Sequence, residues 1–138
     1  MLTKYELKMP RAVYSGEDAL GRIPEIFAAN GVKRLAVFTD KGIEAAGLLE
    51  YPMARVRETG VETIVLDDLP AEPNYMEAQK LVDQCKASGA DFIMAVGGGS
   101  VMDTAKLASI LMTGEYGVKE LLDEPGRARK CMKTLMIP

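Results

Sequence analysis

The sequence contains no histidine and no tryptophan, and only two of its 138 residues are cysteine. Histidine is the commonest transition-metal ligand in proteins and the usual general base near neutral pH. The two cysteines, Cys85 and Cys131, do not have the spacing of a metal or redox motif, and we expect them to be reduced thiols packed as small hydrophobic side chains. The sequence therefore indicates no metal ligand and no catalytic residue in this chain.

Long apolar runs and an excess of positive charge are also missing. The formal net charge is −3, which argues against a nucleic-acid-binding surface, since such surfaces are basic. No run of eighteen apolar residues is present, so no membrane span is expected. The N-terminus lacks the apolar segment of a secretory signal, and we expect a cytoplasmic protein. Hydrophobic residues make up 48% of the chain, enough for the core of a single domain.

Strand patterns alternate with helix patterns along most of the chain. A first helix starts or kinks at Pro24, because proline is poorly tolerated inside a helix. Alternation of strands and helices predicts an α/β domain, with a doubly wound parallel sheet covered by helices on both faces. The expected strands are 34–39, 61–68, 91–96 and 134–138, and the other expected helices are 49–60, 75–88, 100–113 and 118–122.

The N-terminal segment has a different pattern. Residues 4–9 alternate between polar and apolar, which is typical of a half-buried strand, and 12–14 form a second short strand candidate. Together they predict an N-terminal strand hairpin. Its open edge would be able to pair with a second copy of the chain, so a homodimer formed through this strand is one possibility.

Three glycines follow a predicted strand in the stretch AVGGGSVMDTAK at 95–106. Ligands of open α/β sheets bind beyond the carboxyl ends of the strands, and a backbone without Cβ atoms can approach them closely. The first amides of a helix lack partners and favour anions. We expect Gly97, Gly98, Gly99 and Ser100 to bind a phosphate, with the Ser100 hydroxyl capping the helix or donating to the ligand. The alternative is a strand-to-helix turn without a ligand.

Three further side chains have both a structural and a functional interpretation. Asp40 either caps the helix that follows it or accepts hydrogen bonds from the ribose hydroxyls of a nucleotide. Asn74 is expected to cap a helix in a capping-box arrangement with Glu77, and the same ligand could also contact it. Asp103 either forms a capping box with Ser100 or makes a polar contact to the far end of the ligand.

The glycine stretch closely resembles the iron-containing alcohol dehydrogenases, also called the group III family. The family pattern GGGS-x-x-D-x-x-K matches residues 97–106. The segments TDKGIEAAGLL at 39–49 and PAEPN at 70–74 are similar as well, as are the N-terminal strands. The resemblance therefore extends over essentially the whole chain.

This resemblance implies that residues 1–138 are the Rossmann-like N-terminal dinucleotide-binding domain of a two-domain NAD(P)-dependent oxidoreductase. In the family, the glycine turn holds the pyrophosphate. The position matching Asp40 holds the adenosine ribose and favours NAD over NADP, the loop of Asn74 approaches the adenosine, and the position of Asp103 lies near the nicotinamide. The metal of the family, iron or zinc, is bound by a C-terminal all-helical domain that this sequence does not contain. We therefore expect a truncated or isolated domain that is inactive by itself.

The full-length enzyme is expected to transfer a hydride between the nicotinamide and a small alcohol or aldehyde, with the metal as Lewis acid. Two other interpretations stay open. One is a non-catalytic nucleotide-binding or assembly module. The other is a domain of an enzyme similar to glycerol dehydrogenase or dehydroquinate synthase, although Ser100 after the glycines argues against it.

Overall fold

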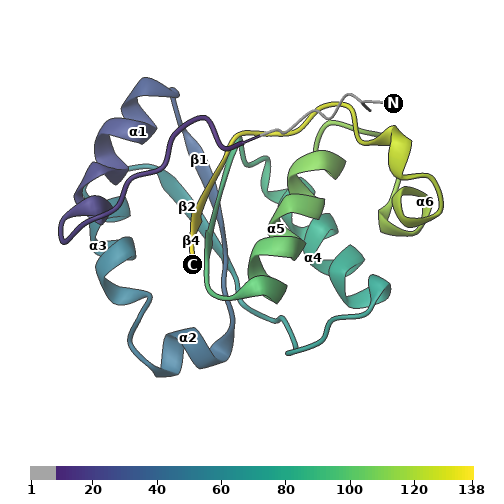
Figure 1. Ribbon diagram of the computed structural model, residues 1–138, viewed down its shortest axis with the longest axis horizontal. Coiled ribbons are helices and arrows are strands. Elements are labelled where there is room, and N and C mark those ends of the chain that lie inside the picture. Colours follow the sequence, from purple (N-terminus) through teal and green to yellow (C-terminus); the bar gives the residue numbers. More distant parts are fainter. Residues whose placement is uncertain (1–8) are drawn as a thin grey trace, which may run out of the picture.

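Four short strands form one parallel sheet at the centre of the computed structural model, which describes residues 9–138 (Figure 1). The order of the strands is β2-β1-β3-β4, and each neighbouring pair is parallel. The two middle strands are almost fully buried, as expected for apolar strands covered on both faces. The strands are β1 (Arg34–Phe38), β2 (Glu62–Leu66), β3 (Phe92–Val96) and β4 (Thr134–Ile137).

Helices cover both faces of this sheet (Figure 1). One layer contains η1 (Ala19–Arg22), α1 (Ile23–Ala29), α2 (Lys41–Ala45) and α3 (Glu50–Arg57). The other contains α4 (Tyr75–Ser88), α5 (Gly99–Leu111) and α6 (Val118–Asp123), followed by η2 (Pro125–Arg127). The chain steps from β1 outward to β2 and then back across β1 to β3. Crossovers of one hand place helices on opposite faces when the direction reverses in this way, so the doubly wound α/β fold is confirmed.

Alternate residues of β1 point to opposite faces, and the strand therefore contributes to two hydrophobic cores. Leu35 and Val37 pack in the core that contains Phe27 of α1, whose ring centroid lies 5.3 Å from that of Phe92. Ala36 belongs to the second core, beneath α4 and α5. Because both faces are filled, the position of β1 in the middle of the sheet is set by packing on two sides.

Several sequence expectations change in detail. The first α-helix begins at Ile23 with Pro24 in its first turn, where proline is tolerated. Residues 12–14 are not a strand: they have no strand partner among residues 9–138, and Val13 is 76% exposed. The rest of the expected hairpin, residues 4–8, lies outside the described residues. Cys85 is buried as expected, whereas Cys131 is exposed, in the segment that leads to β4.

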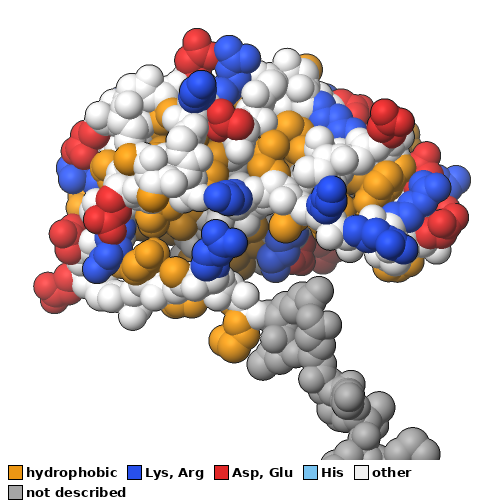
Figure 2. Space-filling view, turned by 90° about the horizontal axis from the view of Figure 1, so that it is seen from above, with side chains coloured by type: hydrophobic (Ala, Val, Ile, Leu, Met, Phe, Trp, Pro, Cys, Tyr) orange, Lys and Arg blue, Asp and Glu red, His pale blue; other side chains and the backbone are white. Residues whose placement is uncertain are grey.

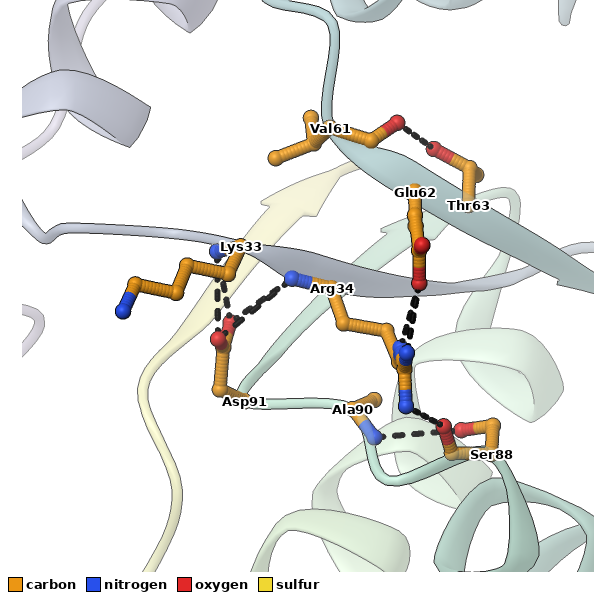
Figure 3. A network of polar contacts seen from close by, with 8 residues as sticks. All are labelled: Lys33, Arg34, Val61, Glu62, Thr63, Ser88, Ala90 and Asp91. Atoms are coloured by element: carbon orange, nitrogen blue, oxygen red, sulfur yellow. Dashed lines mark hydrogen bonds and ion pairs between the residues drawn. The ribbon is translucent and has the colours of Figure 1, made fainter.

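The starts of the strands are held together by a network of polar contacts (Figure 3). The Asp91 carboxylate accepts hydrogen bonds from the backbone amides of Lys33 and Arg34, the shortest at 3.1 Å. The Arg34 guanidinium donates to the Glu62 carboxylate at 2.7 Å and to the Ser88 carbonyl at 3.1 Å. The network therefore links the starts of β1, β2 and β3 and fixes their alignment.

Basic side chains are present on this side of the molecule, together with acidic ones. Figure 2 shows the face at which the strands begin, with Lys and Arg side chains across its middle. Lys33 and Arg34 lie at the start of β1, and Lys133, just before β4, donates to the Asn30 side chain at 2.9 Å.

Within residues 9–138, no helix is both long and apolar enough to cross a bilayer.

Replacing Asp91 tests the alignment network. Asp91→Ala removes the acceptor of the two backbone amides, and we expect the free energy of unfolding to fall by about 1 kcal/mol. Thermal and urea denaturation measure the change. Glu115→Ala, which removes an exposed carboxylate in the loop before α6, is the matched control. Equal stability of the two variants would show that the network does not contribute.

Candidate functional site

The glycine turn connects the end of β3 with the start of α5. Gly97 has a φ of 149°, a conformation that side chains rarely allow. A Cβ atom built on Gly97 would lie 2.9 Å from the Val101 side chain, so this glycine is required by packing as well as by backbone conformation. Cβ atoms on Gly98 and Gly99 would meet nothing within 4 Å. The turn therefore has a closed inner side and an open outer side.

The open side presents the N-terminal amides of α5. The first hydrogen bond inside the helix runs from the Met102 amide to the Gly98 carbonyl at 3.0 Å. The amides of Gly99, Ser100 and Val101 thus have no acceptor within the helix. The N-cap is Gly98, which has no side chain to satisfy them. Chemically, this arrangement offers several N–H donors and the positive end of a helix dipole to an anion.

Ser100 does not cap the helix, contrary to the sequence expectation. The helix begins at Gly99, one residue earlier than expected, and Ser100 is already inside its first turn. Its hydroxyl donates instead to the Ala71 carbonyl at 2.8 Å. The capping box between Ser100 and Asp103 is therefore wrong as well. Asp103 is exposed one turn further along α5 and makes a 3.4 Å ion pair with Lys106.

Asp40 follows β1 and caps α2. One of its carboxylate oxygens, Oδ1, accepts a hydrogen bond from the Ile43 amide at 2.8 Å. The side chain is half-buried. A carboxylate has two oxygens and about four lone-pair positions, so the cap engages only part of its accepting capacity. The structural interpretation of Asp40 is thus confirmed, and it leaves room for a second hydrogen-bonding role.

Asn74 begins α4 and forms the expected capping box with Glu77. The Asn74 Oδ1 accepts from the Glu77 amide at 2.9 Å, and the Glu77 carboxylate accepts from the Asn74 amide at 2.8 Å. Asn74 is exposed in the loop that joins β2 to α4. The Ser100 hydroxyl binds Ala71 in this same loop, so the loop is attached directly to the glycine turn.

Thr39 connects the ends of the two middle strands, a role that the sequence expectations missed. Its fully buried hydroxyl donates to the Val96 carbonyl at 2.9 Å. This bond joins the residue before Asp40 to the residue before Gly97. The signal in the sequence was a hydroxyl at the end of an apolar strand, but its partner depends on which strands are neighbours.

A charged cluster lies beside Asp40, at the ends of β1 and β2. The Lys41 ammonium lies 2.6 Å from the Asp67 carboxylate and 3.6 Å from that of Glu44. The hydrogen bond from Lys41 lowers the pKa of Asp67, and the same bond raises the pKa of Lys41. A hydrogen bond with Asp67 raises the pKa of Glu44. The cluster is thus a connected ion-pair network.

The described residues contain no donor set for a metal ion. Between residues 9 and 138, no three side chains of His, Cys, Asp or Glu come together in a metal-binding arrangement. Burial raises the pKa of the Cys85 thiol to about 11, so this thiol stays protonated near neutral pH and is a poor nucleophile. The groups described above that can bind and orient a ligand are the helix amides of α5 and the Asp40 carboxylate.

Comparison with known proteins identifies close relatives. Residues 10–138 match the family described as iron-containing alcohol dehydrogenase. Sulfoacetaldehyde reductase of Bilophila wadsworthia is 37% identical over 101 residues, covering 70% of this chain and 26% of the relative. An iron-containing alcohol dehydrogenase structure from Thermotoga maritima superposes with a TM-score of 0.83 at 26% identity, covering 98% of this chain and 38% of that one.

A third comparison concerns a structure with bound cofactor. Sulfoacetaldehyde reductase from Bifidobacterium kashiwanohense, solved in complex with NAD+, has a TM-score of 0.67 at 20% identity and covers 77% of this chain and 28% of that one. At this identity the likeness concerns the fold alone. The chain spans about a quarter of the length of the first curated relatives that it matches.

Substitution by alanine should affect stability differently on the two sides of the glycine turn. Gly97→Ala forces a methyl group against Val101 at a positive φ, and we expect it to lower the free energy of unfolding by about 1–3 kcal/mol. Gly98→Ala meets open space and should cost less than about 1 kcal/mol. Urea denaturation of both variants measures the difference. Equal losses would contradict the closed inner side of the turn.

Proposed function

This chain belongs to the iron-containing alcohol dehydrogenase family, and on that premise we propose that residues 1–138 are the dinucleotide-binding domain of an NAD-dependent oxidoreductase. The observation that carries the proposal is the open side of the glycine turn, where unpartnered helix amides face space that a Cβ atom would enter. The turn lies at the carboxyl edge of a doubly wound sheet, next to the point where the strand order reverses. Nucleotides bind in this position in other folds of the same class.

The pyrophosphate of NAD would lie against Gly97, Gly98, Gly99 and Ser100. Because the Ser100 hydroxyl donates its proton to Ala71, we propose that Ser100 contributes its backbone amide to the phosphate. Charge-assisted hydrogen bonds from amides to an anion are stronger than those between neutral groups. Glycine at two exposed positions is what allows the phosphate oxygens to approach these amides.

The adenosine half would extend from the glycine turn toward the ends of β1 and β2. Asp40 would accept hydrogen bonds from the ribose hydroxyls with the capacity that the α2 cap leaves free. Its negative charge would disfavour the 2′-phosphate of NADP. Asn74 would approach the same half from the loop that Ser100 holds against the turn. Asp103, exposed further along α5, would face the nicotinamide half.

When bound, NAD supplies the hydride acceptor for alcohol oxidation, and NADH the donor for aldehyde reduction. The described residues would bind and orient the cofactor and take no part in proton transfer. They also offer no donor set for the metal of the family, so no metal-dependent step is assigned to them. We therefore propose that this chain alone turns over no alcohol. A non-catalytic nucleotide-binding module remains the second candidate, because it would use the same glycine turn.

The binding of NADH tests the glycine turn. We expect the purified protein to bind NADH, and Gly98→Ala to raise its dissociation constant about tenfold or more, because the methyl group enters the space of the phosphate. Cofactor fluorescence or calorimetry measures the constant. Gly126→Ala, another glycine whose Cβ would meet nothing within 4 Å, is the matched control. Unchanged binding in Gly98→Ala would remove the turn from the cofactor site.

The preference between cofactors tests Asp40. Asp40→Gly removes the ribose acceptor and the charge that repels a 2′-phosphate, so we expect the preference for NADH over NADPH to narrow about tenfold. Titrations with both cofactors give the ratio. Because Asp40 also caps α2, Asp40→Ser, which keeps a capping oxygen without the charge, is the second variant. If neither substitution changes the ratio, Asp40 has no ribose role.

A further inference from the structure

We propose that Asp67 is a specificity-determining residue that favours NAD by pairing with the Lys41 ammonium, whose charge would otherwise attract a 2′-phosphate. This inference rests on the proposed function, because it requires the Asp40 carboxylate to face the adenosine ribose. It adds a residue just beyond the end of β2 to those that determine the choice of cofactor.

Asp40 and Lys41 are neighbours in sequence, but their charges favour different cofactors. A carboxylate after the strand, such as Asp40, suits the ribose hydroxyls of NAD, whereas a nearby cation accommodates the 2′-phosphate of NADP. Lys41 follows Asp40 directly and begins α2. A free ammonium at this position would attract the phosphate that Asp40 repels. Both residues are compatible with an NAD site only if another group neutralises the charge of Lys41.

The structure shows where the charge of Lys41 goes. Its ammonium lies 2.6 Å from Asp67 and 3.6 Å from Glu44. The side chains of the two acids are only 26% and 30% exposed, whereas that of Lys41 is 71% exposed. The lysine therefore reaches from solvent to a pair of more buried acids, and its charge is balanced by them.

The strand order determines the direction in which Lys41 is held. Phe38 at the end of β1 pairs with Leu66 at the end of β2, so Asp67 follows directly at the end of β2. The glycine turn lies at the end of β3, on the opposite side of β1. Asp67 thus lies on the β2 side of Lys41, the side toward which the adenosine half would extend, and balances the charge of the ammonium there. The ribose position would then face Asp40 without an uncompensated cation.

The test is the ratio of NADPH to NADH affinity in variants of this cluster. In Asp67→Asn/Glu44→Gln, both acids lose their charge and keep their shape, so Lys41 is released. We expect NADPH binding to tighten about fivefold, and NADH binding to stay within about twofold. Adding Lys41→Met to this background should abolish the gain. Circular dichroism verifies that each variant is folded.

Asp68→Asn is the matched control. Asp68 is the adjacent acid, but it pairs with Lys80 at 3.3 Å and its side chain is 75% exposed. The substitution removes one negative charge nearby without releasing Lys41, and the ratio should not change. An equal gain in Asp68→Asn, a gain that persists after Lys41→Met, or an unchanged ratio would each overturn the inference. Failure of the unaltered protein to bind NADH would instead overturn the proposed function.

Discussion

The pairing of β1 with β3 is the constraint on which the rest of this structure depends. These strands are neighbours in the sheet although α2, α3, β2 and α4 separate them in sequence. Both are buried on two faces, and the Thr39 hydroxyl joins their ends. Parallel strands place their carboxyl ends at one edge, so this pairing brings Asp40 to the side of the glycine turn. The candidate site is therefore a consequence of strand order, and the residues that stabilise the order also position the site.

Charged and polar groups have different roles at the edge where the strands begin and at the edge where they end. At the edge where the strands begin, Asp91 and Arg34 bind backbone groups and neighbouring strands, so their charges stabilise the fold. At the carboxyl edge, the amides of α5 have no acceptor within the helix, and the Asp40 cap uses only one oxygen. Hydrogen-bonding capacity thus remains at the carboxyl edge, which agrees with the general position of ligands in open α/β sheets.

The sequence predicts the features that depend on local pattern. The parallel sheet, the glycine turn and the capping box of Asn74 with Glu77 follow from hydrophobic runs and from residues three positions apart. The helix start was misplaced by one residue, because both Gly98 and Ser100 are acceptable N-cap residues and only the backbone conformation distinguishes them. The bonds of Thr39 and Lys41 were missed because their partners lie on strands whose neighbours a single sequence does not reveal.

The bond from Ser100 to Ala71 has a thermodynamic consequence. It closes a ring in the chain through α4 and β3 and attaches the loop before α4 to the turn before α5. The conformational entropy that this contact costs is lost during folding, before any ligand arrives. A molecule that contacts both segments would meet a preorganised surface and would not have to order either of them.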